Sequence, residues 1–176
     1  MDDRTLRYMQ RFVANVSIGS STLRGQGRGT AAVARQWLAE LDLAQFSVIH
    51  RAPFGRRLDR LTNLLRERFP AESRDNWGAA RKALNIFLRD AVNNHHLRRR
   101  FAIAHIDRYL EVPLDSQVAA RLGAEEEGNA LPKWTTIKAL KPWVNADYQT
   151  VAAAVARRRG VERVHLDLFY WRDFAS

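Results

Sequence analysis

Residues 76–85 read Asn76-Trp77-Gly78-Ala79-Ala80-Arg81-Lys82-Ala83-Leu84-Asn85. Gly78 favours a tight turn, and small residues after a turn let the N–H groups of a helix N-terminus approach a phosphate. The apolar residues that follow recur at helical spacing, and these are Leu84, Phe87, Leu88 and Val92. The sequence therefore predicts a hairpin-like segment over residues 70–93, with Arg81 and Lys82 in the first turn of its second helix.

The helical pattern continues on both sides of this segment. We expect further helices over residues 6–16, 30–41, 53–69, 103–110, 115–123 and 145–159, a glycine-rich loop over 19–29 and an exposed acidic loop over 125–129. Thr30 is the expected N-cap of the second helix, and Pro53 is expected to open the third. No alternating run is long enough to require a sheet, so the predicted fold class is all-α. The length allows one compact domain, 1–176, or two helical halves that share a central cleft.

Composition narrows the choice of partner. The chain has 176 residues, a formal net charge of +10, and 25 Arg against four Lys. An excess of this kind indicates a polyanionic partner, and we expect double-stranded DNA. The chain has no Cys, which excludes disulfides, thiol catalysis and iron–sulfur clusters. No apolar run approaches the roughly 20 residues of a membrane span, and no secretory signal is evident, so a cytoplasmic monomer without membrane contact is expected.

A second motif lies downstream, in the stretch Pro113-Leu114-Asp115-Ser116-Gln117-Val118-Ala119-Ala120-Arg121-Leu122-Gly123. It places a carboxylate at the N-terminus of a helix, where the helix dipole and the free N–H groups favour the ionised form.

Taken in order, the two motifs resemble the helix-hairpin-helix DNA glycosylases. The match runs over Gly78, Arg81, Lys82, Ala83 and Asn85, and then over Pro113, Leu114, Asp115, Val118 and Arg121. The interval of 115 − 82 = 33 residues is similar to that of the archaeal 8-oxoguanine glycosylase branch. The usual hairpin sequence Leu-Pro-Gly-Val-Gly is replaced by residues 74–78, Arg-Asp-Asn-Trp-Gly.

The resemblance implies an enzyme that extrudes and excises a modified base, with Lys82 and Asp115 as its catalytic residues. It implies DNA contacts by Trp77, Gly78, Ala80, Arg81, Asn85 and Arg121, and no metal or other cofactor. We expect the pocket for the extruded base to use Arg24, Gln26, Asp167 and Trp171, because the edge of a base needs hydrogen-bonding partners. The base is either an oxidised one such as 8-oxoguanine or a hypermodified phage base such as glucosylated hydroxymethylcytosine, and a role in phage defence is slightly favoured.

Each assignment has a simpler alternative. Lys82 is equally typical of a phosphate contact, and Asp115 of an N-cap alone. His95 and His96 are adjacent and do not form a metal site. The runs Arg98–Arg100 and Arg157–Arg159 are most often solvated helix faces, with a share in phosphate binding as the second interpretation. The competing function is therefore a non-catalytic DNA- or RNA-binding helical module, or a protein-interaction subunit.

Overall fold

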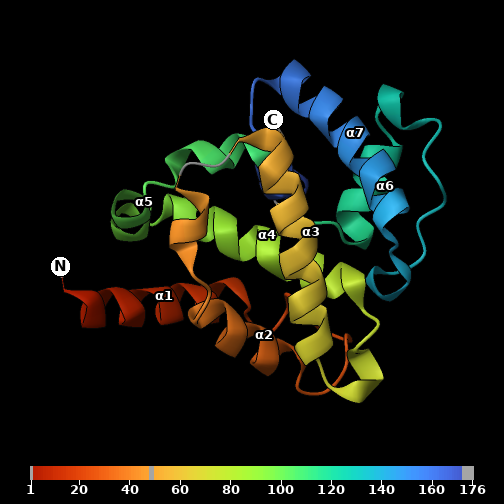
Figure 1. Cartoon of the computed structure of the whole chain (residues 1–176). Helices are drawn as coiled ribbons and strands as arrows, with labels where there is room; N and C mark the ends of the chain where they lie inside the picture. Colours follow the sequence, from red (N-terminus) through yellow and green to blue (C-terminus); the bar gives the residue numbers. More distant parts are fainter. Residues whose placement is uncertain (1, 48–49, 172–176) are drawn as a thin grey trace.

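A computed structural model describes residues 2–47 and 50–171, and these are all-helical, as the sequence predicts (Figure 1). The α-helices are α1 (Asp3–Ser17), α2 (Thr30–Ala39), α3 (Arg51–Arg68), α4 (Trp77–Asn93), α5 (His95–Phe101), α6 (Ser116–Gly123), α7 (Pro142–Arg159) and α8 (Leu166–Trp171). Short 3-10 turns connect them, namely η1 (Leu43–Phe46), η2 (Ala71–Ser73), η3 (Ala104–Tyr109), η4 (Glu126–Gly128), η5 (Ile137–Ala139) and η6 (Arg163–His165).

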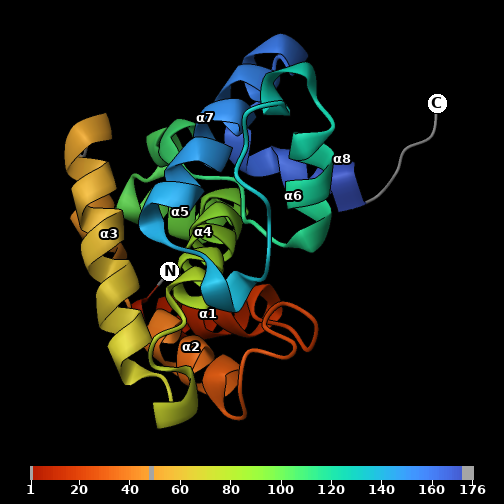
Figure 2. The ribbon, with the colours of Figure 1, turned by 90° about the vertical axis from the view of Figure 1, so that its right-hand side faces the viewer.

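Helix α4 is the central element of the fold. Every residue from Trp77 to Leu88 is buried, and α4 contacts α1, α2, α3, α5, η3 and η5. Figure 2 shows α4 surrounded by the other helices. Asn76 is the N-cap of α4, because its side chain accepts a hydrogen bond of 3.0 Å from the backbone N–H of Ala79. Residues 70–93, predicted as a hairpin-like segment, comprise η2 and α4 and follow the end of α3.

The core consists of two hydrophobic clusters. The larger one is built by α1 to α5, η1 and η3, with Val164 added from the C-terminal part. The smaller one is built by α6, α7 and α8, with Trp77 and Leu140 added. Helix α4 supplies residues to both clusters, because Trp77 belongs to the smaller and Ala79 to the larger. The turn of α4 after Trp77 therefore lies where the two clusters meet.

Several helix ends differ from the sequence expectations. Gly29, with φ of 82°, occupies the N-cap position of α2, whereas Thr30 is the first helical residue and its buried hydroxyl hydrogen-bonds to Gln26 and Ser73. Helix α3 begins at Arg51, two residues before Pro53. Helix α7 begins at Pro142, whose missing N–H costs nothing at the first position of a helix.

Two further segments, 95–101 and 125–127, have more regular structure or more contacts than the sequence predicts. Residues 95–101 form the separate helix α5, anchored by the fully buried Leu97. The acidic run 125–127 is not a free loop, because Glu125 and Glu127 form ion pairs with Arg158 and Arg159 of α7. Within the described ranges, none of the helices combines the length and the apolar character needed to cross a membrane.

The start of α4 packs so closely on the segment before α7 that a side chain larger than hydrogen does not fit. A Cβ atom on Gly78 would lie 2.2 Å from the carbonyl oxygen of Ile137 and 2.9 Å from Cβ of Leu140. We expect Gly78→Ala to lower the free energy of unfolding by about 1–3 kcal/mol, as overpacking does, measured by urea denaturation.

The matched control for this substitution is Gly55→Ala in α3. A Cβ atom on Gly55 meets nothing within 4 Å, so the change should be neutral or stabilise the protein by about 0.5–1 kcal/mol through helix propensity. Equal effects of the two substitutions would contradict the close packing at Gly78.

Candidate functional site

The side chains of Lys82 and Asp115, one from each of the two motifs, meet in the interior. Nζ of Lys82 donates a hydrogen bond of 2.9 Å to Oδ2 of Asp115 across a sequence separation of 33 residues. The residues are only 9% and 6% exposed, so the ion pair is largely removed from water. A charge pair in such surroundings interacts more strongly than one on the surface.

Asp115 is held by the start of α6 as well as by Lys82. Its Oδ1 accepts hydrogen bonds of 3.0 Å from the backbone N–H groups of Gln117 and Val118, which makes it the N-cap of α6. The simpler interpretation of Asp115 as an N-cap is therefore correct for one carboxylate oxygen. The other oxygen, Oδ2, accepts the hydrogen bond from Nζ of Lys82.

A third side chain completes the site from α8. The indole Nε1–H of Trp171 donates a hydrogen bond of 3.1 Å to the same Oδ2 of Asp115, and Trp171 is 56% exposed. A large aromatic ring with one face in water therefore lies beside the buried pair. Among the four residues predicted for a base pocket, Trp171 is the one that contacts Asp115.

The other three predicted pocket residues lie in different surroundings. Arg24 is exposed on the 19–29 loop. The side-chain oxygen of Gln26 accepts a hydrogen bond of 2.8 Å from Nδ2 of Asn76, which ties this loop to the start of α4. Asp167 is buried and forms an ion pair of 2.7 Å with Arg89; burial raises the pKa of Asp167, and the Arg89 charge opposes that effect only in part.

The DNA contacts predicted for α4 do not fit its position in the interior. Trp77, Gly78, Ala80 and Asn85 are all buried, and the segment 137–140 packs directly on Gly78. The amide of Asn85 bonds to protein on both sides, donating to the carbonyl of Arg81 and accepting from the N–H of Glu111. These residues therefore shape the core instead of contacting phosphate. Arg121, at the end of α6, is exposed.

Arg81 is likewise an internal residue. Its guanidinium forms ion pairs of 2.9 Å with Asp59 and 2.7 Å with Glu111, and it hydrogen-bonds to Thr62. Its charge is thus neutralised on the α3 and η3 side of α4, and it supplies no free positive charge beside Lys82. Arg81 thus joins α4 to α3 and to the segment after η3, and the predicted DNA contact of Arg81 stays a prediction.

Glu111 is the partner that sequence reasoning missed. It accepts bonds from Arg81 and Asn145, so it links α4 to α7. Burial raises the pKa of Glu111 and is the largest single effect, but the charge and hydrogen bonds of Arg81, together with Arg163 and Asn145, outweigh burial and lower the pKa. A glutamate between Leu110 and Val112, both apolar, was the available signal, because an acidic residue in an apolar run is buried only when paired.

This network generates a stability prediction. Arg81→Met should lower the free energy of unfolding at neutral pH by about 3–5 kcal/mol, because it leaves Glu111 charged and buried without its main partner. Since the folded pKa of Glu111 is lowered in the native protein, its stabilisation is present above the ordinary glutamate pKa and is lost as the pH falls through the folded value.

Without Arg81, burial raises the pKa of Glu111, so the difference between variant and native protein should shrink towards acid pH. Urea denaturation between neutral and acid pH measures it. Arg60→Met, an exposed substitution on α3, serves as the control and should change stability by less than about 0.5 kcal/mol. A pH-independent difference would refute the pairing.

Among the described residues no three His, Asp or Glu side chains are grouped as a metal site. Comparison with models of protein families, with curated proteins and with solved structures gave no match to this chain. The site that the residues themselves define is thus a buried lysine–aspartate pair at the junction of two hydrophobic clusters, with an exposed tryptophan beside it.

Proposed function

We propose that this protein is a DNA N-glycosylase with a helix-hairpin-helix-like arrangement, in which Lys82 and Asp115 are the catalytic residues. The observation that carries the proposal is their contact of 2.9 Å in a largely buried site, made by residues from two separate motifs. The two motifs, taken in order, predict this contact. A lysine that lies on a solvent-exposed helix face or binds phosphate does not require a buried carboxylate partner.

The pair has the chemistry that the reaction needs. Cleavage of an N-glycosidic bond develops positive charge at C1′ of the sugar, which a carboxylate at Asp115 stabilises. In the covalent route, Oδ2 of Asp115 takes a proton from the Lys82 ammonium. The freed amine attacks C1′ as the bond from C1′ to the base breaks, and the departing base takes up the proton held by Asp115, which returns to the carboxylate. Ring opening then gives a Schiff base on Lys82, which permits β-elimination. In the hydrolytic route, Asp115 activates a water instead.

The surroundings support a base-extrusion mechanism. The pair is buried, so a base inside an intact duplex cannot reach it, whereas an extruded nucleotide can be directed into the site. Trp171 offers an aromatic face at the edge of the pair, where a base would stack. Double-stranded DNA as partner is supported by the net charge of +10, and the protein would act as a monomer.

The substrate is a modified base, of the oxidised or the hypermodified phage type. Removal of a hypermodified base such as glucosylated hydroxymethylcytosine would give the protein a role in phage defence. Duplexes that carry 8-oxoguanine or the glucosylated base distinguish these possibilities by release of the free base.

Borohydride trapping tests the covalent route. With a duplex that contains an abasic site, the native protein should form a reducible adduct, and Lys82→Ala and Lys82→Arg should abolish it, because neither variant carries an amine that forms the Schiff base. On the modified-base duplex, Asp115→Asn should slow base release by at least about 10²-fold.

The matched control is Lys138→Ala, which removes one of the exposed lysines and should leave adduct formation unchanged. Base release that survives Asp115→Asn would remove the catalytic assignment. Duplex binding with neither base release nor adduct would identify the non-catalytic binding module, and weak binding that is nearly independent of salt would identify a protein-interaction subunit.

A further inference from the structure

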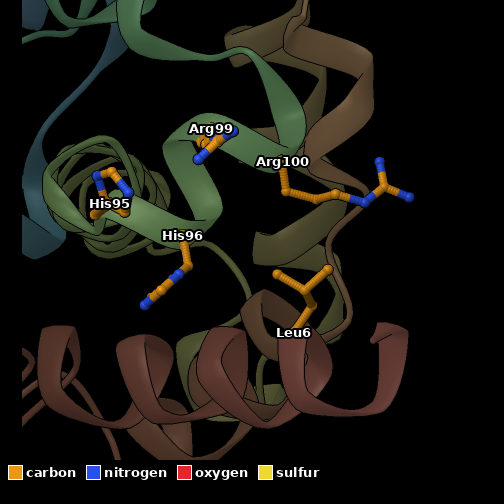
Figure 3. A pocket seen from close by; sticks show the side chains of 5 residues that line it. All are labelled: Leu6, His95, His96, Arg99 and Arg100. Atoms are coloured by element: carbon orange, nitrogen blue, oxygen red, sulfur yellow. The ribbon is translucent and has the colours of Figure 1, made fainter. Parts of the chain in front are cut away.

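A basic pocket lies between α1 and α5, apart from the lysine–aspartate pair. It has a volume of about 530 Å³ and is lined by Leu6, His95, His96, Arg99 and Arg100 (Figure 3). Pockets of this size accommodate small ligands. Figure 3 shows the four α5 side chains above Leu6 of α1, which forms an apolar floor.

The sequence of α5 places these four side chains on one side of the helix. Asn94 caps the helix by accepting a hydrogen bond of 3.1 Å from the N–H of Leu97, and Leu97 is fully buried. At 100° per residue, positions 95, 96, 99 and 100 fall within one arc that excludes Leu97. Arg98 falls outside that arc and does not line the pocket. The buried leucine thus fixes the rotation of α5 and directs two histidines and two arginines into one concavity.

The positive charge of this pocket is poorly compensated. Among the described residues no carboxylate lines it, and Arg100 forms a loose ion pair of 3.7 Å with Asp3, both exposed. Within the described part of the chain, the Arg99 side chain makes neither a hydrogen bond nor an ion pair, and His95 and His96 have only each other as ring partners. By contrast, Arg81, Arg89 and Arg158 are all paired with carboxylates.

We propose that the α1–α5 pocket is a phosphate-binding site. A guanidinium presents paired N–H donors that match two phosphate oxygens, and an imidazole adds a further N–H donor. The ligand is therefore a phosphoryl group, supplied either by a nucleic-acid backbone or by a free phosphate compound. With a DNA backbone as ligand the pocket would be a second contact of the proposed glycosylase, but its phosphate chemistry does not depend on that activity.

The first experiment uses pyrophosphate as the probe. Titration of the full chain should shift the ring NMR signals of His95 and His96, and the double variant Arg99→Gln/Arg100→Gln should weaken this binding at least about tenfold. Arg98→Gln is the matched control, because it removes one arginine of the same helix from outside the pocket, and it should bind as the native protein does.

The second experiment identifies the source of the phosphate by fluorescence anisotropy with a labelled duplex. If the ligand is the DNA backbone, the double variant should lose affinity relative to Arg98→Gln, with a salt-dependence slope smaller by about 1.8 for two lost contacts. If the ligand is a free phosphate compound, pyrophosphate binding is lost while duplex affinity equals that of Arg98→Gln.

Either result supports a phosphate site. The proposal is overturned if the double variant and Arg98→Gln have the same affinity for pyrophosphate and also the same affinity for the duplex. None of these measurements requires catalysis, so loss of the phosphate site and failure of the glycosylase assignment are separate outcomes.

Discussion

The burial of α4 is the constraint on which the rest of the structure depends. This helix carries two consecutive cations, Arg81 and Lys82, into an interior where an unpaired charge costs several kcal/mol. Carboxylates from other segments of the chain must therefore pair with these two cations. Glu111 reaches Arg81 from the segment after η3, and Asp115 reaches Lys82 from the start of α6. The path of the chain from residue 110 to residue 116 is thus set by the need to neutralise one turn of α4.

The two cations differ in their partners: Arg81 bonds to several groups, whereas Lys82 pairs with Asp115. Arg81 keeps its proton at any physiological pH and bonds to Asp59, Thr62 and Glu111, so it is a fixed crosslink. Lys82, in contrast, pairs with Asp115, a carboxylate that also caps α6. Because the Arg81 guanidinium bonds to Asp59, Thr62 and Glu111, its charge is compensated away from Lys82.

The sequence predicted much of the local structure and part of the site. Asp115 acts as a helix N-cap where its position indicates, and the contact of Lys82 with Asp115 was expected from two motifs read in order. The burial of the whole first half of α4 was not predictable, because Arg81, Lys82 and Asn85 read as the polar face of an amphipathic helix. Their burial depends on partners from distant segments, chiefly Glu111, that no local spacing identifies. Helix α5 was missed for a related reason, since Leu97 is its single fully buried residue.

The two oxygens of Asp115 allow one residue both to cap a helix and to pair with Lys82. Oδ1 accepts hydrogen bonds from the backbone N–H groups of Gln117 and Val118, which fixes the position of the carboxylate. Oδ2 is bonded only to side chains, Lys82 and Trp171, both of which can change their hydrogen bonds without disturbing the backbone. An asparagine at this position can still cap α6 through its carbonyl oxygen, but it lacks the charge that pairs with Lys82. The structure therefore separates the capping role of Asp115 from its role towards Lys82, although both belong to a single side chain.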